Sequence, residues 1–186
     1  MAKIYTKYGD RGHTFTKSNP KTPKNEIIIH LLGEIDELNS CVGHLTALID
    51  NNLKKDCIVK ILHQVMSTLF SVGAYVGYDT AIDIKKLDEF IFKLEDEIDK
   101  FENDNGEIRN FILPTGGMCS SYAQVCRAVC RRVERNLYDL TSLADVEVIG
   151  MFFNRLSDFL FSLARTCNRF EVKKEIIWNN FLAVQS

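Results

Sequence analysis

Proline and long apolar runs are both scarce in this sequence. The 186 residues contain only three prolines, and two of them, Pro20 and Pro23, lie close to the N-terminus. Because proline interrupts helices, the long proline-free remainder favours an α-helical protein. No uninterrupted apolar run approaches the roughly 20 residues that span a bilayer, so we expect no membrane partner.

Strong net charge and targeting signals are also missing. The formal net charge is −2, which gives no reason to expect nucleic acid as a partner. The N-terminus shows no apolar signal-peptide region, and this predicts a cytoplasmic protein. Hydrophobic residues make up 46% of the chain, enough for one domain with a core.

Motifs for metal or nucleophilic catalysis are absent as well. The six cysteines include no C-x-x-C pair, and we predict reduced core side chains rather than metal ligands. The four histidines show neither H-E-x-x-H nor E-x-x-H, which argues against a di-iron bundle. No Ser/His/Asp or Cys/His arrangement is visible. A reaction on this chain would need a substrate that brings its own nucleophile.

Apolar residues recur at helical spacing along most of the chain. They predict five helices, at about Glu26–Asp50, Lys55–Tyr78, Ile84–Phe101, Cys119–Leu140 and Val146–Val172. Short links between them indicate an all-α, ferritin-like up-and-down bundle with neighbours crossing at about 20°. We divide the chain into a polar arm, residues 1–25, and one bundle domain, residues 26–186.

The predicted fourth helix carries an unusual polar face. At 100° per residue, Arg127, Arg131, Glu134 and Arg135 share that face, and Arg132 lies on its flank. Clustered arginines repel one another unless an anion lies among them, and guanidinium groups suit carboxylates and phosphates. The alternative is a solvated face in which Glu134 pairs with a neighbour.

Two other predicted helices carry specific polar residues. The fifth helix places Asn154, Asp158, Arg165 and Arg169 on one face, where the first two would suit a ribose, a phosphate oxygen or a hydrated cation, or simply bridge helices. The first helix places Asp36 in a stripe of small residues. This acid needs a cation, and Arg127 or Arg131 is a candidate, within the chain or across a subunit interface.

The N-terminal arm, "YTKYGDRGHTFTKSNPKTPK", combines glycines, hydroxyls and lysines. Gly9 and Gly12 allow tight turns and close backbone approach. The pattern favours a phosphate-cradling loop, although it matches neither the Walker A nor the G-x-G-x-x-G sequence. A flexible basic tail is the alternative.

The chain resembles the PduO-type ATP:cob(I)alamin adenosyltransferases in five segments that occur in the family's order. They are "TKYGDRGHT", "GEIDELNSCVG", "FILPTGG", "CRAVCRRVER" and "FFNRLSDFLFSLAR", and the resemblance extends from about Ile4 to Arg169. It implies a five-helix homotrimer with active sites between subunits. The implied reaction transfers the 5′-deoxyadenosyl group of ATP to cob(I)alamin, forming adenosylcobalamin and releasing triphosphate. Cob(I)alamin is itself a strong nucleophile, which agrees with the missing catalytic base.

The resemblance also implies roles for individual residues. It makes Arg131, Asn154 and Phe111 catalytic, and Phe111 would displace the lower axial base of cobalamin; by itself Phe111 would be read as a core aromatic. Asp36 and Arg127 would form an intersubunit ion pair. Mg²⁺ would be held mainly through the ATP phosphates, without protein ligands. The implied nucleotide-binding residues are Thr6, Lys7, Tyr8, Gly9, Thr14, Phe15, Lys24, Arg131, Arg132, Glu134, Arg135 and Asn154.

Tyr8 is a departure, since the family more often has a small hydroxyl residue there. Two other functions compete with catalysis. One is a carrier that binds ATP and cobalamin and hands adenosylcobalamin to an enzyme that depends on it. The other is a structural bundle whose arginines bind nothing. Stabilisation of the fold by added ligand distinguishes the structural bundle, which would show none, from the enzyme and the carrier.

Overall fold

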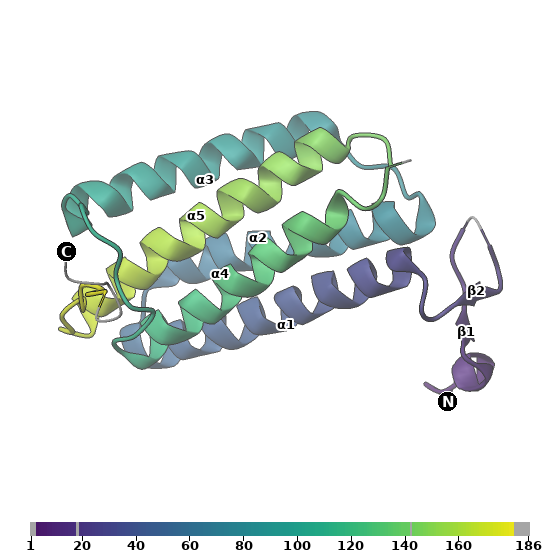
Figure 1. Ribbon diagram of the computed structural model, residues 1–186, viewed down its shortest axis with the longest axis horizontal. Helices are drawn as coiled ribbons and strands as arrows, with labels where there is room; N and C mark the ends of the chain where they lie inside the picture. The colour runs from purple at the N-terminus through teal and green to yellow at the C-terminus, as the bar shows by residue number, and fades with distance from the viewer. Residues whose placement is uncertain (1–2, 18, 142, 181–186) are drawn as a thin grey trace.

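The computed structural model describes residues 3–17, 19–141 and 143–180. Within these residues, five long helices run alternately up and down along one axis (Figure 1). The all-α, five-helix up-and-down bundle predicted from the sequence is therefore confirmed. The helices are α1 (Ile27–Leu53), α2 (Asp56–Tyr78), α3 (Ile84–Asn105), α4 (Met118–Leu137) and α5 (Val146–Phe170).

The core forms where the apolar stripes of these helices meet. α1 packs against α2 and α4, while α5 packs against α3 and α4. α5 contributes the most buried residues of the five helices, and its Phe152, Phe153 and Phe159 are fully buried. On α4 the face opposite the arginines is buried, as its spacing predicted. Both polar faces considered above therefore lie on helices that the core holds rigidly.

The helix ends differ from the predicted ends by a few residues, because local backbone conformation sets them. α3 begins after Asp83, whose carboxylate accepts a hydrogen bond from the Lys86 amide at 3.2 Å. It runs beyond Phe101 to Asn105, and Gly106 follows with a positive φ. α1 continues to a left-handed Lys54. α4 and α5 end two or three residues earlier than predicted.

α2 is the one helix among the described residues that is long and apolar enough to cross a membrane, by length and composition alone. The sequence prediction looked for an uninterrupted apolar run and so did not single out α2, whose high mean hydropathy allows a few polar residues between the apolar ones. One face of α2 packs on α1, and a core helix passes the same test. Beside the α1 contact, Phe70 of α2 is 69% exposed, which is a large apolar side chain for a solvent-facing surface.

The N-terminal arm is more ordered than a plain loop. It contains a short 3-10 helix, η1 (Tyr8–Arg11), and a two-stranded hairpin, β1 (His13–Thr14) and β2 (Thr22–Pro23), with Thr14 opposite Thr22. The arm projects from the end of the bundle where α1 begins (Figure 1). Lys17 attaches it to the end of α2, through a backbone bond to Gly77 and an ion pair with Asp79.

Candidate functional site

The polar face of α4 presents two exposed arginines that have no acidic partner. Arg131 and Arg135 form no ion pair among the described residues, and Arg135 instead donates to the Arg131 carbonyl at 2.9 Å. Between them Glu134 accepts a 3.0 Å hydrogen bond from the Asn154 side chain on α5. The structure therefore brings together four of the residues predicted to bind a nucleotide.

Arg132 is the remaining α4 residue that was predicted to bind the nucleotide, and its side chain is turned towards α1. It forms ion pairs with Glu34 and Glu37, and Asn136 donates to both carboxylate oxygens of Glu34 at 2.8 Å. These contacts fasten α4 to α1. Arg132 is about two-fifths exposed, so nucleotide binding by its remaining donors stays a prediction.

The predicted polar face of α5 is wrong in one respect. Arg165 does not share an open face with Asn154, because its side chain is only 3% exposed and pairs with Glu102 and Glu175. Asp158 pairs with Arg155, one turn away, at 3.0 Å. A helical wheel gives the angle of Arg165 correctly, but it does not show that the end of α3 covers this part of α5.

Phe111 lies at the mouth of a cavity of about 630 Å³, on the long connection between α3 and α4. Its side chain is 80% exposed, so Phe111 is not a core aromatic. Gln124 and Arg127 of α4 line the same cavity, as does Trp178 from the segment after α5. An open apolar cavity with a few polar groups is typical of a binding site for an organic ligand.

Arg127 carries a positive charge that the chain does not neutralise. Its Nε donates to the Gln124 side chain at 2.6 Å, and no carboxylate pairs with it in the described part of the chain. Burial, with a further contribution from the positive charge of Arg131, lowers the pKa of Arg127. Arg127, Arg131 and Arg135 follow one another at intervals of four, so a single cationic stripe about 12 Å long leads away from the Phe111 cavity.

Asp36 does not meet Arg127 within one chain. It is exposed on α1, beside a hollow of about 350 Å³ that Phe70 and Tyr78 of α2 also line. Asn39 lines the same hollow, and its buried Oδ1 has no hydrogen-bond partner among the described residues. The predicted pairing of Asp36 with Arg127 is therefore not made inside the subunit, and its intersubunit form stays a prediction.

The predicted ATP loop folds back on the end of the arm. Lys24 lies over Gly9, so that a Cβ at Gly9 would be 2.9 Å from the Lys24 Nζ, a close approach that the flexible lysine side chain could relieve by moving. The Thr6 hydroxyl accepts from the Tyr8 amide at 3.3 Å, and the Tyr8 hydroxyl donates to the Pro20 carbonyl. Tyr8 thus closes the arm on itself.

Thr14 and Phe15 lie further along the arm. Thr14 is a β1 residue, and Phe15 stacks on Tyr78 of α2 with ring centroids 6.3 Å apart. No described contact joins the arm to Arg131 or Arg135. In one subunit the arm is therefore separate from the arginine face and the Phe111 cavity, which share Arg127.

Several residues of these surfaces escaped sequence analysis. Trp178 is the sequence's one tryptophan, and a lone exposed aromatic near the C-terminus was the available signal. Glu34 and Glu37 occupy the "GEIDEL" segment, but only their angle on α1 relative to Arg132 shows their role. Gln124 carried no signal.

Metal and thiol chemistry find no support in the residues that the structure describes. No group of three or more His, Cys, Asp or Glu side chains could hold a metal ion there. All six cysteines are free; four are buried, as predicted, but Cys57 is exposed. Burial, with the nearby Glu171 carboxylate, raises the pKa of Cys119 to about 11, which leaves it a poor nucleophile near neutral pH.

Known proteins similar to this chain form one group. The family model described as cobalamin adenosyltransferase matches residues 4–167. The human corrinoid adenosyltransferase MMAB is 35% identical over 96% of this chain and 74% of its own length. A cobalamin adenosyltransferase of Cupriavidus metallidurans is 33% identical, over 96% and 95% of the two chains.

Solved structures agree with the sequence relatives. A variant of the PduO-type ATP:corrinoid adenosyltransferase from Lactobacillus reuteri, complexed with cobalamin and ATP, superposes with a TM-score of 0.84. It is 31% identical, and the match covers 96% of this chain and all of that one.

Proposed function

The chain belongs to the cobalamin adenosyltransferase family, and we propose that it transfers the 5′-deoxyadenosyl group of ATP to cob(I)alamin. The products are adenosylcobalamin and triphosphate. In this step the Co(I) electron pair forms a bond to the 5′ carbon of ATP. The bond from that carbon to its phosphate oxygen breaks, and the triphosphate leaves with the electron pair.

One observation carries this proposal. The cationic stripe of α4, Arg127 to Arg135, connects an apolar cavity at Phe111 with a polar patch at Glu134 and Asn154. A planar macrocycle with an apolar face suits the cavity, and a polyphosphate suits arginines that lack acidic partners. The reaction needs these two binding surfaces side by side, because its substrates are a corrinoid and a nucleotide.

The residues would act mainly by positioning and by charge. Arg131 and Arg135 would stabilise the negative charge that builds on the departing triphosphate. Asn154, held through Glu134, would orient the nucleotide. The apolar ring of Phe111 would occupy the lower face of the corrin and keep its axial base away from cobalt. A cobalt centre without that ligand is reduced more easily to Co(I).

MgATP is the proposed form of the nucleotide substrate. Mg²⁺ binds proteins through one or two carboxylates together with substrate phosphates. The described chain offers no acidic cluster for the ion but does offer isolated acids such as Glu134. The ATP phosphates and water would therefore supply most of the Mg²⁺ ligands.

The complete site would form between copies of the chain, most simply in a homotrimer. Three features of the α1–α2 face support this. Phe70 is exposed, and among the described residues the Asn39 acceptor has no hydrogen-bond partner and Asp36 has no cation beside it. Arg127 of a neighbouring copy would satisfy Asp36, and an arm would reach an arginine face that it does not touch in its own subunit. Sedimentation of the purified protein tests the trimer.

An anaerobic assay tests the reaction itself. Purified protein is mixed with ATP, Mg²⁺ and chemically reduced cobalamin, and the cob(I)alamin absorbance is followed. We expect a light-sensitive product and one triphosphate per product. ATP-dependent thermal stabilisation without product would instead favour a carrier, which hands adenosylcobalamin to the enzyme that uses it. We place the reaction in the cytoplasm, where the free cysteines would stay reduced.

A further inference from the structure

The connection that carries Phe111 needs outside support to hold one conformation. It spans residues 106–117, has no helix of its own, and leaves Phe111 largely exposed. The segment after α5, residues 171–180, runs antiparallel beside it, and we name it the C-terminal strap. The Leu113 amide donates to the Ile176 carbonyl at 2.8 Å, and the Trp178 amide donates to the Phe111 carbonyl at 2.7 Å.

The same pairing sets the direction of the aromatic side chains. Ile112 and Ile177 face each other in an isolated β-bridge. The Phe111 and Trp178 rings meet edge to face, with centroids 6.2 Å apart, and both line the cavity. The position of Phe111 therefore depends on the position of the strap.

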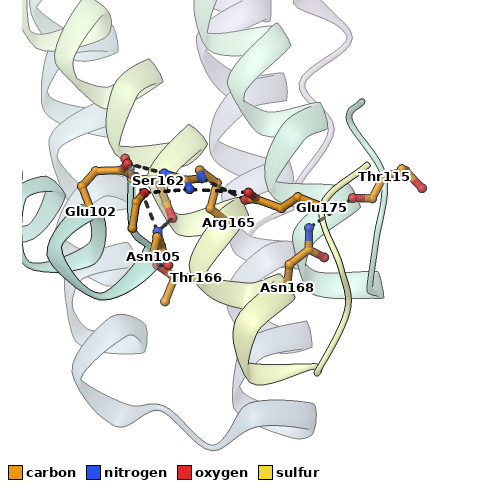
Figure 2. Close-up of polar contacts among 9 residues, drawn as sticks. Glu102, Asn105, Thr115, Ser162, Arg165, Thr166, Asn168 and Glu175 are labelled. Carbon is orange, nitrogen blue, oxygen red and sulfur yellow. Dashed lines mark hydrogen bonds and ion pairs between the residues drawn. The ribbon is translucent and has the colours of Figure 1, made fainter. Parts of the chain in front are cut away.

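Arg165 holds the strap from inside the bundle (Figure 2). Its Nε donates to Glu175 of the strap at 2.8 Å, and its other nitrogens bond Glu102 of α3 and, at 3.0 Å, the Gly106 carbonyl. One buried guanidinium thus joins α3, the start of the Phe111 connection and the strap.

The next turn of α5 holds the other end of the connection. Asn168 accepts from the Gly117 amide at 3.0 Å and donates to the Thr115 carbonyl at 3.2 Å, a contact visible in Figure 2. Glu171, the first strap residue, accepts from the Cys119 and Ser120 amides at the start of α4. Both ends of the connection are therefore fixed to α5.

Stability alone does not require this arrangement. A buried ion pair is expensive to desolvate, and apolar residues of similar volume often serve stability as well. Helices α3 and α5 are already joined on the surface by Arg169 and Asp104, at 2.8 Å. What Arg165 adds is a directed bond to Glu175, and so to the strap that lies against Phe111.

We propose that Arg165 and Glu175 are positioning residues, which fix the C-terminal strap and through it the angle of Phe111 towards the corrin. This inference deepens the proposed function and rests on it. It assigns to the end of α5 a role in cobalamin handling, although neither side chain would touch the reacting atoms.

The test compares Glu175→Gln with Asp104→Asn. Both changes remove one charge from an ion pair with an α5 arginine, but only the first pair reaches the strap. We expect Glu175→Gln to raise the KM for cobalamin about tenfold, as for one lost charged hydrogen bond. It should also lower the fraction of bound cob(II)alamin that has lost its lower axial base, seen by absorbance with ATP present. The KM for ATP should not change.

A structural readout accompanies the kinetics. Amide hydrogen exchange at Leu113 and Trp178 should accelerate in Glu175→Gln and stay unchanged in Asp104→Asn. Kinetics and cob(II)alamin spectra that are the same in both variants would overturn the inference. Failure of the proposed function would look different, because the unsubstituted protein would then form no product.

Discussion

The arginine Arg165 on α5 and the arginine pair Arg131 and Arg135 on the neighbouring helix α4 have opposite surroundings. Arg165 on α5 is buried, and carboxylates of α3 and the strap neutralise it. Arg131 and Arg135 on α4 are exposed and have no acidic partner among the described residues. Burying a guanidinium forces the chain to supply its counter-charges, so the first arginine is structural. The second group keeps its charge available for an anion from outside.

Arg132 and Arg127 lie between these extremes. Arg132 has acidic partners, but its own side chain stays about two-fifths exposed. Arg127 is half-buried, has only an amide partner, and its pKa is lowered by burial. Substitution of the buried arginine should therefore lower mainly the free energy of unfolding, and substitution of the exposed arginines should lower mainly the turnover rate.

The largest expected effect is that of Arg165→Leu on folding. Removing the guanidinium leaves Glu102 and Glu175 without their counter-charge. Breaking a buried pair typically costs about 3–5 kcal/mol, and because both acids are about a third exposed we expect a loss near the lower end of this range. Denaturant unfolding should show this loss in the free energy of unfolding. A loss no larger than that of Arg169→Leu, the exposed neighbour, would mean that the two arginines are equivalent.

Arg131→Ala should produce the converse result. Removing a donor that stabilises the departing triphosphate should lower kcat about 10²–10³-fold. The free energy of unfolding should change little, because the side chain is exposed and leaves behind no acidic partner in the part of the chain that the structure describes. Stopped-flow measurement of cob(I)alamin consumption at saturating ATP checks this. Full turnover and unchanged ATP affinity in the variant would contradict the role given to the α4 face.

The difference between the two groups could be only partly predicted from the sequence. Apolar spacing predicted five helices, and the angle around α4 correctly separated its arginines from the core. The same angular argument failed at Arg165, which lies eleven residues from Asn154 and at nearly the same angle. Burial of a side chain depends also on its position along the helix axis. At the level of Arg165 the end of α3 and the strap cover α5, whereas at the level of Asn154 they do not.

Apart from its tryptophan, Trp178, the strap had no sequence signal. Its residues, "EVKKEIIWNN", show neither alternation nor helical spacing, and they pair with a segment about 65 residues away. Such a pairing is decided by tertiary packing rather than by local propensity. The motif matches identified Phe111, but not what holds it in place.

A substitution at Arg127 tests whether this residue pairs with Asp36 of a neighbouring subunit in the trimer. Arg127→Asp should place two acids together at the proposed interface and weaken trimerisation, because like charges brought together across an interface cost several kcal/mol. Sedimentation should then detect smaller species, and turnover should fall with them. The double variant Asp36→Arg/Arg127→Asp reverses the charges and should restore assembly. Wild-type assembly in the single variant would remove this pair from the interface.

The smallest effect is expected at Glu37→Gln, where an exposed acid loses its charge opposite Arg132. An exposed ion pair contributes about 0.2–1 kcal/mol, and Glu34 remains to pair with the guanidinium. The free energy of unfolding should therefore fall by less than about 1 kcal/mol. If Arg132 also binds the nucleotide with its free donors, releasing it from Glu37 should leave the KM for ATP unchanged or slightly lower. A raised KM would mean that Glu37 holds Arg132 in its binding orientation, which would place this arginine with Arg165 rather than with Arg131.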